Sequence, residues 1–412
     1  MKPRYFYLAL AFMAPANIQA AAVSLKTGGD AVNTSSFNSA GAWSVAATPS
    51  AGNTYSVAVQ FLRTPVSGSS FTFAGDSLSI NTSGGFLFKG TGTAATITVS
   101  NFILNGGLIR SGSGVGDTMR LAGGLSVTGT GSEIRSDQSP YIIDSVVTGT
   151  GALIIASGGT GFPVTFNGTN TYTGNLTVST TQTGASTILS STSQWKFAIG
   201  ANGINNNISG TGKVTFNGAF NIDLTGASTA AGSSWNLVTV TGTKTYGATF
   251  SVTGFTSTGT AGSRFWLDSS GKYYFSEATG TLYGPDTDAD ADGLKDTWEI
   301  TKFGSIVAQS GADDFDGDFA TNLEEQTAGT DPTSRTSSPD TDGDGIADAW
   351  ETAYGLDPTT SDSSLDSDSD GFTNLQEFTA NTSPIDSAIT PSKAKLTHRW
   401  SFNGDLSDSV GG

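Results

Sequence analysis

The sequence predicts a mainly β protein, with a parallel β-helix or solenoid-like N-terminal region followed by an acidic stalk of loop-helix repeats. Short apolar runs, separated by Gly, Ser, Thr and Asn, fill residues 23–284 and are typical of many brief strands joined by turns. After Gly284 and Pro285 the pattern changes abruptly to aspartates at every second position. This change of composition predicts a domain boundary between residues 23–284 and 285–390.

The N-terminus predicts export. Lys2 and Arg4 precede an apolar run over residues 5–13, and small residues follow near residue 22, so we expect residues 1–22 to be a signal peptide. The run is too short to cross a bilayer, and no later stretch supplies about 20 consecutive apolar residues. We therefore expect a secreted, extracellular or outer-surface protein with no transmembrane segment. The chain has no cysteine, which excludes disulfides and thiolate-held metals.

Within residues 23–284, Thr and Val favour a pleated surface and helical periodicity is nearly absent. Alternation is clearest at residues 71–73, 78–80, 95–99 and 176–178, where we expect strands. A solenoid explains this composition best, because stacked coils need small residues at their corners. A pair of β-sandwiches is the alternative. A disordered linker would not carry large apolar groups such as Trp43, Phe61, Phe86, Trp195, Trp235 and Trp266.

One run carries a family resemblance. Residues 167–178 read Asn-Gly-Thr-Asn-Thr-Tyr-Thr-Gly-Asn-Leu-Thr-Val. This run resembles the autotransporter-associated β-strand repeat, whose signature is a Gly-x-Asn-Thr-Tyr-Thr-Gly core leading into a strand. The resemblance implies a parallel β-helix of the kind found in passenger regions of large exported bacterial proteins. It does not imply a transporter barrel.

The negative charge of the chain is concentrated in one block. The formal net charge is -17, and the acidic residues gather between Asp286 and Asp386, where the only basic residues are Lys295, Lys302 and Arg335. Such a block repels nucleic acid and anionic lipid, because both are negatively charged. Its natural partners are cations.

Four loops of this block begin at Asp288, Asp314, Asp340 and Asp366, each 26 residues after the last. Acidic or amide side chains stand at loop positions 1, 3, 5, 9 and 12, which is the EF-hand spacing for Ca2+, and position 7 would contribute its backbone carbonyl. The predicted calcium ligands are Asp288, Asp290, Asp292, Leu294, Asp296 and Glu299; Asp314, Asp316, Asp318, Ala320, Asn322 and Glu325; Asp340, Asp342, Asp344, Ile346, Asp348 and Glu351; and Asp366, Asp368, Asp370, Phe372, Asn374 and Glu377.

The second loop departs from this pattern. Three loops have glycine at position 6, where the chain must turn sharply, but the second has Phe319, so we expect it to be the weakest or most distorted site. A short helix should follow each loop and end on a left-handed residue. The predicted helix ends are Gly304, Gly329, Gly355 and Asn381.

These loop-helix units resemble thrombospondin type 3 repeats of the bacterial kind. In that family Asp-x-Asp-x-Asp-Gly-x-x-Asp-x-Trp-Glu alternates with an Asp-x-Asp-Gly-x-Thr-Asn-x-x-Glu version, and both versions occur between Asp286 and Asp386. The resemblance implies that calcium lines up along the repeats and stiffens the segment into a spacer.

The last residues, 391–412, resemble the opening of a laminin-G-like, concanavalin-A-like jelly roll, of which only the first strand would be present. We therefore expect the chain to be a fragment of a longer product. The missing part of that domain would bind a glycan or a protein of the extracellular matrix.

Two functions follow from these patterns. The first is a non-enzymatic adhesion or matrix protein with a solenoid shaft and a calcium-stiffened spacer. The second is a carbohydrate-active enzyme, a polysaccharide lyase or glycoside hydrolase, with its site on the β-helix. Its carboxylates would come from the one compact charged cluster there. The single histidine, His398, argues against most histidine-based catalysis. The cluster consists of Glu133, Arg135, Asp137 and Asp144.

Overall fold

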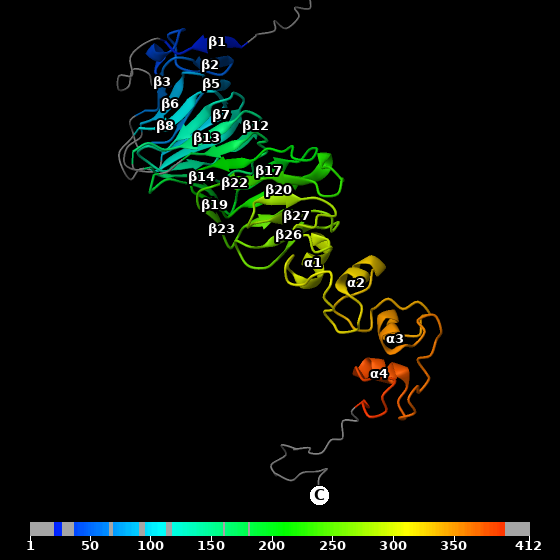
Figure 1. Ribbon diagram of the computed structural model, residues 1–412. Coiled ribbons are helices and arrows are strands. Elements are labelled where there is room, and N and C mark those ends of the chain that lie inside the picture. Colours follow the sequence, from blue (N-terminus) through cyan, green and yellow to red (C-terminus); the bar gives the residue numbers. More distant parts are fainter. Residues whose placement is uncertain are drawn as a thin grey trace, which may run out of the picture. The chain divides into compact units, whose positions relative to one another are not determined.

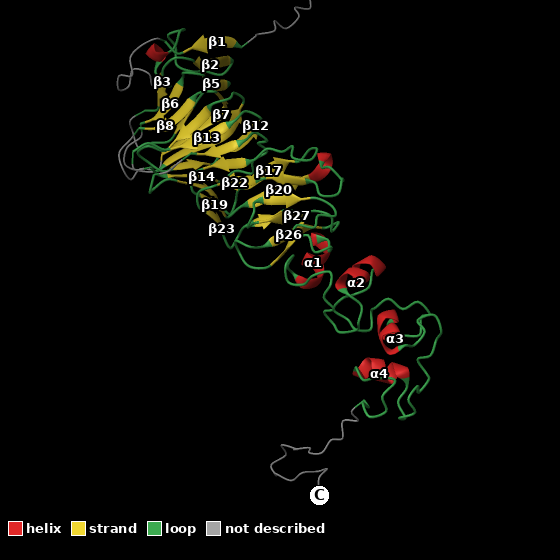
Figure 2. Cartoon of the chain, in the orientation of Figure 1, coloured by secondary structure: helices red, strands yellow, loops and turns green. Residues whose placement is uncertain are grey.

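The computed structural model describes residues 20–26, 37–65, 69–89, 95–112, 118–159, 161–179 and 182–391. Most of the predicted signal peptide therefore lies outside the described residues, as do the laminin-G-like stub from residue 392 onwards and His398. The chain divides into two compact units, Met1–Pro285 and Asp286–Gly412. Strands fill the described part of the first unit and α-helices occur in the second, as Figure 2 shows.

The first unit is a parallel β-solenoid (Figure 1). The chain passes from a twelve-stranded sheet to an eight-stranded sheet and back, and each strand pairs in parallel with a strand of the neighbouring coil. Ile80 pairs with Leu104, and Leu104 pairs with Val127, so one coil takes about 23 residues in this region. The parallel pairing confirms the predicted solenoid and excludes the two antiparallel sandwiches for the described coils.

The strand bounds follow from the sheets. The twelve-stranded sheet contains β1 (Ala21–Ser24), β2 (Asn53–Val57), β5 (Ser77–Asn81), β7 (Ala95–Asn105), β9 (Met119–Val127), β11 (Tyr141–Ile143), β14 (Pro163–Phe166), β16 (Ser186–Leu189), β19 (Val214–Phe216) and β23 (Lys244–Tyr246), with β4 (Phe71–Thr72) beside β7 and β12 (Val146–Gly149) beside β9. The eight-stranded sheet contains β3 (Phe61–Arg63), β6 (Gly85–Phe88), β8 (Leu108–Ser111), β10 (Ser132–Arg135), β13 (Leu153–Ala156), β15 (Leu176–Val178), β18 (Ile208–Gly210) and β22 (Val238–Val240). A small parallel sheet contains β17 (Gln194–Ala198), β20 (Ala219–Asp223) and β24 (Ser251–Val252). The 3-10 turns are η1 (Ala40–Ala42) and η2 (Leu224–Gly226).

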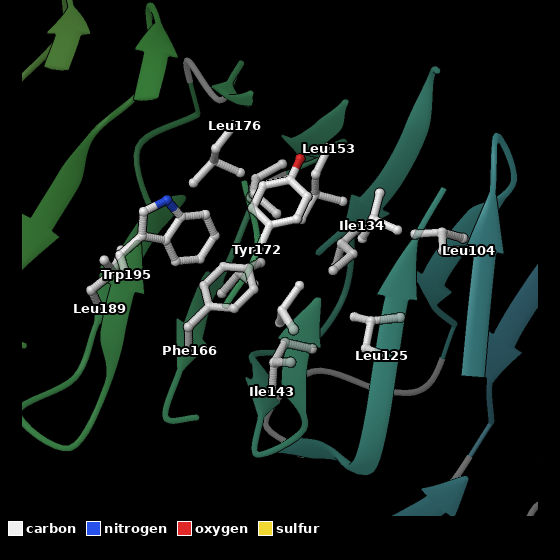
Figure 3. Packing of buried hydrophobic residues seen from close by; sticks show 14 of the residues in the cluster. Leu104, Leu125, Ile134, Ile143, Leu153, Phe166, Tyr172, Leu176, Leu189 and Trp195 are labelled. Carbon is white, nitrogen blue, oxygen red and sulfur yellow. The ribbon is translucent and has the colours of Figure 1, made fainter. Parts of the chain in front are cut away.

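Alternate residues of each coil point into a continuous apolar core. The strand β7 shows the pattern plainly, since its inward residues are buried and the residues between them are partly exposed. Figure 3 shows how the inward side chains of successive coils lie against one another. Burying one such leucine or isoleucine contributes about 1.5–3 kcal/mol to stability. The side chains labelled in Figure 3 are Leu104, Leu125, Ile134, Ile143, Leu153, Phe166, Tyr172, Leu176, Leu189 and Trp195.

The motif at residues 167–178 forms one corner of the solenoid. Tyr172 is fully buried, and its hydroxyl donates to the carbonyl oxygens of Gly151 (2.6 Å) and Asn175 (2.8 Å). Asn170 is buried beside it and accepts from the main-chain N–H of Val147 at 2.8 Å. A side chain at Gly174 would place its Cβ 2.1 Å from the carbonyl oxygen of Gly151. The corner therefore has no room for a side chain at Gly174, and the side chains of Asn170 and Tyr172 hydrogen-bond to its backbone.

An antiparallel sheet combines one strand from within the last coils with four strands that come after them. It contains β21 (Ser234–Asn236), β28 (Thr281–Tyr283), β27 (Tyr274–Ser276), β26 (Phe265–Asp268) and β25 (Phe255–Thr258), in that order. Phe275 of this sheet lies 5.7 Å from Phe220, centroid to centroid, and Trp266 lies 5.5 Å from Phe250. These rings cover the last coils, so the antiparallel sheet closes the apolar core.

The second unit contains four loop-helix repeats. All four predicted helix ends are confirmed, because the terminating residues have left-handed φ values between 56° and 81°. Thr321 and Thr373 begin their helices with capping boxes. Trp350 and Phe378, whose rings lie 5.4 Å apart, belong to a small apolar cluster. The helices are α1 (Asp296–Phe303), α2 (Asn322–Ala328), α3 (Asp348–Tyr354) and α4 (Asn374–Ala380).

Candidate metal centre

Each acidic loop curls through two left-handed residues, at positions 4 and 6. Glycine adopts such a conformation without strain, whereas a side chain makes it costly. The sequence predicted the turn at position 6 but not the one at position 4, which is glycine in only two of the loops. The pairs are Ala291 and Gly293, Gly317 and Phe319, Gly343 and Gly345, and Ser369 and Gly371.

The first aspartate of each loop fixes this turn from inside. In the third loop, Asp340 Oδ1 accepts from the N–H groups of Gly343 (2.8 Å) and Asp344 (3.3 Å), while Oδ2 accepts from Gly345 (2.9 Å). Asp344 in turn accepts from the N–H of Ile346 at 3.0 Å. The other three loops repeat the bond from the position-6 N–H to their first aspartate. The loops are thus curled before any ion is considered.

The position-12 glutamates lie at the centre of the site. Glu299, Glu325, Glu351 and Glu377 are all 0 % exposed, because each stands on the first turn of a helix that packs against its own loop. Both carboxylate oxygens of Glu299, Glu351 and Glu377, and Oε2 of Glu325, are buried without a hydrogen-bond donor. A buried oxygen without a donor costs about 1–3 kcal/mol, and more if it is charged.

Burial and mutual repulsion raise the pKa of these glutamates. Desolvation is the larger cause, and repulsion by the loop aspartates adds to it. The pKa rises to about 8 for Glu299, Glu325 and Glu351 and to about 7 for Glu377. Asp316 shows the same effect, with a pKa raised to about 6. Carboxylates that are costly to ionise in this way are suited to a site that supplies a compensating positive charge.

Carboxylate oxygens of the loops converge closely enough to share one ion. Ligand atoms from Asp290, Asp296 and Glu299 lie within 4.8 Å of one another, as do those from the first three aspartates of the second and third loops. Such all-oxygen sets suit hard cations, and the 12-residue spacing with a terminal glutamate suits Ca2+. The orphaned glutamate oxygens fit this reading, since an ion would supply the partner that the protein does not.

The predicted ligand set also includes positions 7 and 9, and position 9 is aspartate in the first and third loops and asparagine in the second and fourth. At position 7, Leu294, Ala320 and Ile346 are buried and Phe372 is partly buried. At position 9, Asn322 Oδ1 and Asn374 Oδ1 are buried and have no donor, as expected of ligands. In the third loop, position 9 is Asp348, and both of its carboxylate oxygens accept hydrogen bonds from Thr341. The position-9 carboxylate of the third loop is therefore already engaged.

The expected distortion of the second loop is not found. Phe319 adopts φ 76°, which lies in the same left-handed region as the 93–99° of the position-6 glycines in the other loops, and its N–H donates to Asp314 Oδ2 at 2.9 Å. Its ring lies 5.9 Å from that of Tyr354 in α3, centroid to centroid. This aromatic contact offsets part of the backbone strain. The weaker calcium affinity of the second loop stays a prediction. The positive charge of Arg335 acts on Asp316 and Asp318, which supports the prediction because a nearby cation competes with a bound ion.

Sequence reasoning missed one acidic residue of the third site. Asp362 lies eleven residues after Glu351, outside the 12-residue frame, yet its carboxylate clusters with Asp344 and Glu351. The contact depends on how the chain returns between the third and fourth loops, which the ligand spacing does not reveal.

The charged cluster predicted in the solenoid is held by ion pairs. Glu133 and Arg135, both on β10, pair at 2.6 Å between Oε1 and Nε. Asp137 pairs with Arg110 of the neighbouring β8, and it also accepts from the N–H of Gly158 at 2.6 Å. Each of these carboxylates therefore has an arginine partner.

Asp144 does not join this group closely. It follows β11 of the other large sheet and accepts from Arg120 at 2.8 and 2.9 Å and from Asn167 at 2.8 Å. The predicted cluster thus divides between two sheets.

None of the helices in the described part of the chain has the length and apolarity needed to cross a lipid bilayer. No curated protein and no solved structure matches the chain. A family model described as "Bacterial TSP3 repeat" matches residues 340–361, which contain the whole third loop and its helix.

Proposed function

We propose that this chain is a secreted or cell-surface protein of structural, adhesive function, in which the four acidic loops bind calcium and make residues 286–386 a stiff spacer. The observation that carries the proposal is the set of position-12 glutamates, which are fully buried with carboxylate oxygens that no protein donor satisfies. The "Bacterial TSP3 repeat" match over the third loop supports the same reading.

The chemistry of calcium binding is that of a hard dication with six to eight oxygen ligands. In the third loop Asp340, Asp342 and Asp344 would offer carboxylates, Ile346 its carbonyl oxygen and Glu351 two oxygens. The equivalent residues would serve in the other loops. The apolar cluster of this unit is small, so charge neutralisation inside the loops would provide much of its order.

The solenoid would serve as the shaft of the protein. We propose that its corner at residues 167–178 is an autotransporter-associated β-strand repeat, which the hydrogen bonds of Asn170 and Tyr172 and the lack of space at Gly174 support. We also propose that residues 391–412 begin a laminin-G-like module for a glycan or protein ligand, and that residues 1–22 direct export. Sequencing the N-terminus of the secreted protein would test the last point.

We propose further that the solenoid is not catalytic. Most glycosidases use two carboxyl groups that flank the scissile bond, and the one that acts as the acid has a raised pKa. Glu133, Asp137 and Asp144 are instead each bound by an arginine. Turnover of a polysaccharide that is lost in Glu133→Gln or Asp137→Asn would contradict this proposal.

Calorimetric titration of the full chain with calcium tests the main proposal, using two adjacent glutamates of α2. Glu325→Gln should remove one ion from the stoichiometry, because Glu325 is the buried position-12 residue. Glu324→Gln is the matched control, because Glu324 is exposed and its side chain only completes the capping box of α2. Glutamine can do the same, since Gln376 completes the capping box of α4. Affinities in the range of about 0.1–1 mM are expected for an extracellular module. Fewer than three bound ions in the unaltered chain would contradict the proposal.

A further inference from the structure

The third loop receives an acidic residue from the segment that leads to the fourth. The N–H groups of Asp362 and Ser363 both donate to Asp344 Oδ2, each at 2.8 Å, which brings this segment against the loop. The carboxylate of Asp362 then lies within 4.8 Å of those of Asp344 and Glu351. Only 8 % of Asp362 is exposed.

A second observation, the burial of Glu351, points to a ligand in this cluster. Glu351 is 0 % exposed, and neither of its carboxylate oxygens has a hydrogen-bond partner. Placing another buried acid beside it increases the repulsion among the carboxylates, and no donor in the described part of the chain reaches the Glu351 oxygens. A cation bound among Asp344, Glu351 and Asp362 would offset this repulsion.

The first pair of repeats provides an internal comparison. Ser310 occupies the place that Asp362 has in the second pair, and one of the two main-chain bonds recurs, with Gly311 N–H donating to Asp292 Oδ2 at 3.1 Å. The segment therefore approaches the first loop through Gly311, but it brings no carboxylate there, and the N–H and hydroxyl of Ser310 donate to Asp313 instead. The chain contains two versions of one site that differ at this position.

Asp362 also touches the fourth loop. Asn374, the position-9 residue of that loop, donates through Nδ2 to the carbonyl oxygen and to Oδ1 of Asp362, both at 3.1 Å. The other amide atom of Asn374, Oδ1, is buried without a donor. One residue thus contacts the third cluster and orients a predicted ligand of the fourth.

We propose that Asp362 is an additional calcium ligand of the third loop, supplied from outside its 12-residue frame, and that it couples binding at the third and fourth loops. This inference rests on the proposed function, because it requires the loops to bind calcium. The third loop is then the tightest of the four sites, since an added carboxylate raises affinity and its supporting segment is already in place. Binding at one loop favours the other because both need Asp362 in one position.

The test is a calcium titration of the full chain labelled with 15N-glycine and followed by NMR. Gly293, Gly345 and Gly371 report the first, third and fourth loops separately, because the N–H of each donates to the first aspartate of its own loop. Asp362→Asn should weaken binding at the Gly345 signal about tenfold, leaving Gly293 unchanged. Asp386→Asn is the control, since it removes an exposed carboxylate of the same unit and should change affinity less than about twofold.

Each outcome decides a separate point. Equal third-loop affinities in Asp362→Asn and Asp386→Asn would overturn the added ligand while leaving the proposed function intact. If no glycine signal of the unaltered chain responds to calcium, the proposed function fails and this inference fails with it. The reciprocal change Ser310→Asp should tighten the first loop by several-fold, which a loss of folding cannot imitate.

A double-mutant cycle tests the coupling. Glu377→Gln removes a ligand of the fourth loop and should weaken the third loop by about threefold when Asp362 is present. In the Asp362→Asn background it should have no such effect. If Glu377→Gln leaves the calcium affinity of the third loop unchanged in both backgrounds, the proposed coupling is overturned.

Discussion

At the scale of single residues, the backbone conformation of the acidic loops restricts which residues fit at positions 4 and 6. Two residues of every loop are left-handed, and three of these eight positions are not glycine, since Ala291, Phe319 and Ser369 carry side chains there. A side chain in this conformation costs roughly 1–2 kcal/mol. The loops therefore retain strain that glycine would relieve.

Ala291→Gly should raise the free energy of unfolding of the calcium-bound second unit by up to about 1 kcal/mol. The exposed methyl group of Ala291 contributes little packing, and the gain is reduced by the extra freedom of glycine in the unfolded chain. Phe319→Gly should give no such gain, because it removes the ring contact with Tyr354. Urea unfolding at fixed calcium measures both, and an equal gain in the two variants would contradict the explanation.

At the scale of elements, the sequence predicted the strands and helix ends that depend on neighbouring residues of the chain. Strand alternation located β5, β7 and β15, and the left-handed helix ends were read directly from Gly304, Gly329, Gly355 and Asn381. The 12-residue spacing located acidic side chains that the loops bring together, because a site for one ion needs alternate residues of one short segment. Asp362 and the antiparallel closing sheet were not predicted, since both depend on contacts between residues far apart in the sequence.

The solenoid corner provides a test at this scale. Tyr172→Phe should lower the free energy of unfolding of the first unit by about 1–3 kcal/mol, because the carbonyl oxygens of Gly151 and Asn175 lose a buried donor. Gly174→Ala should cost more, since its Cβ would lie 2.1 Å from a backbone oxygen. Unfolding followed with excess chelator separates this unit from the calcium loops. A Tyr172→Phe protein as stable as the unaltered chain would show that water replaces the hydroxyl.

At the scale of the whole molecule, pH and calcium should act on the second unit in opposition. The four position-12 glutamates have folded pKa values of about 7 to 8, raised from 4.5 by burial and by repulsion from the loop aspartates. Without calcium, their contribution to stability is fully present below the unfolded pKa and is lost as pH rises through about 8. With calcium, ionised glutamates are required, so affinity rises over the same range.

This opposition gives a measurable proton count. At pH 7 most of these glutamates are protonated in the calcium-free chain, and binding four ions should release about three protons. Calorimetry in two buffers of different ionisation enthalpy measures the release directly. Glu324→Gln should leave the count unchanged, whereas Glu325→Gln should lower it by about one. A binding enthalpy independent of the buffer would contradict the raised pKa values.

The closing sheet of the solenoid has a consequence for assembly. Stacked parallel coils are in principle open-ended, because each coil offers the next a ready apolar surface and strand edges. Here Phe275 and Trp266 come from antiparallel strands and occupy that surface. A second chain cannot continue the coil there, so this end resists head-to-tail growth into fibres.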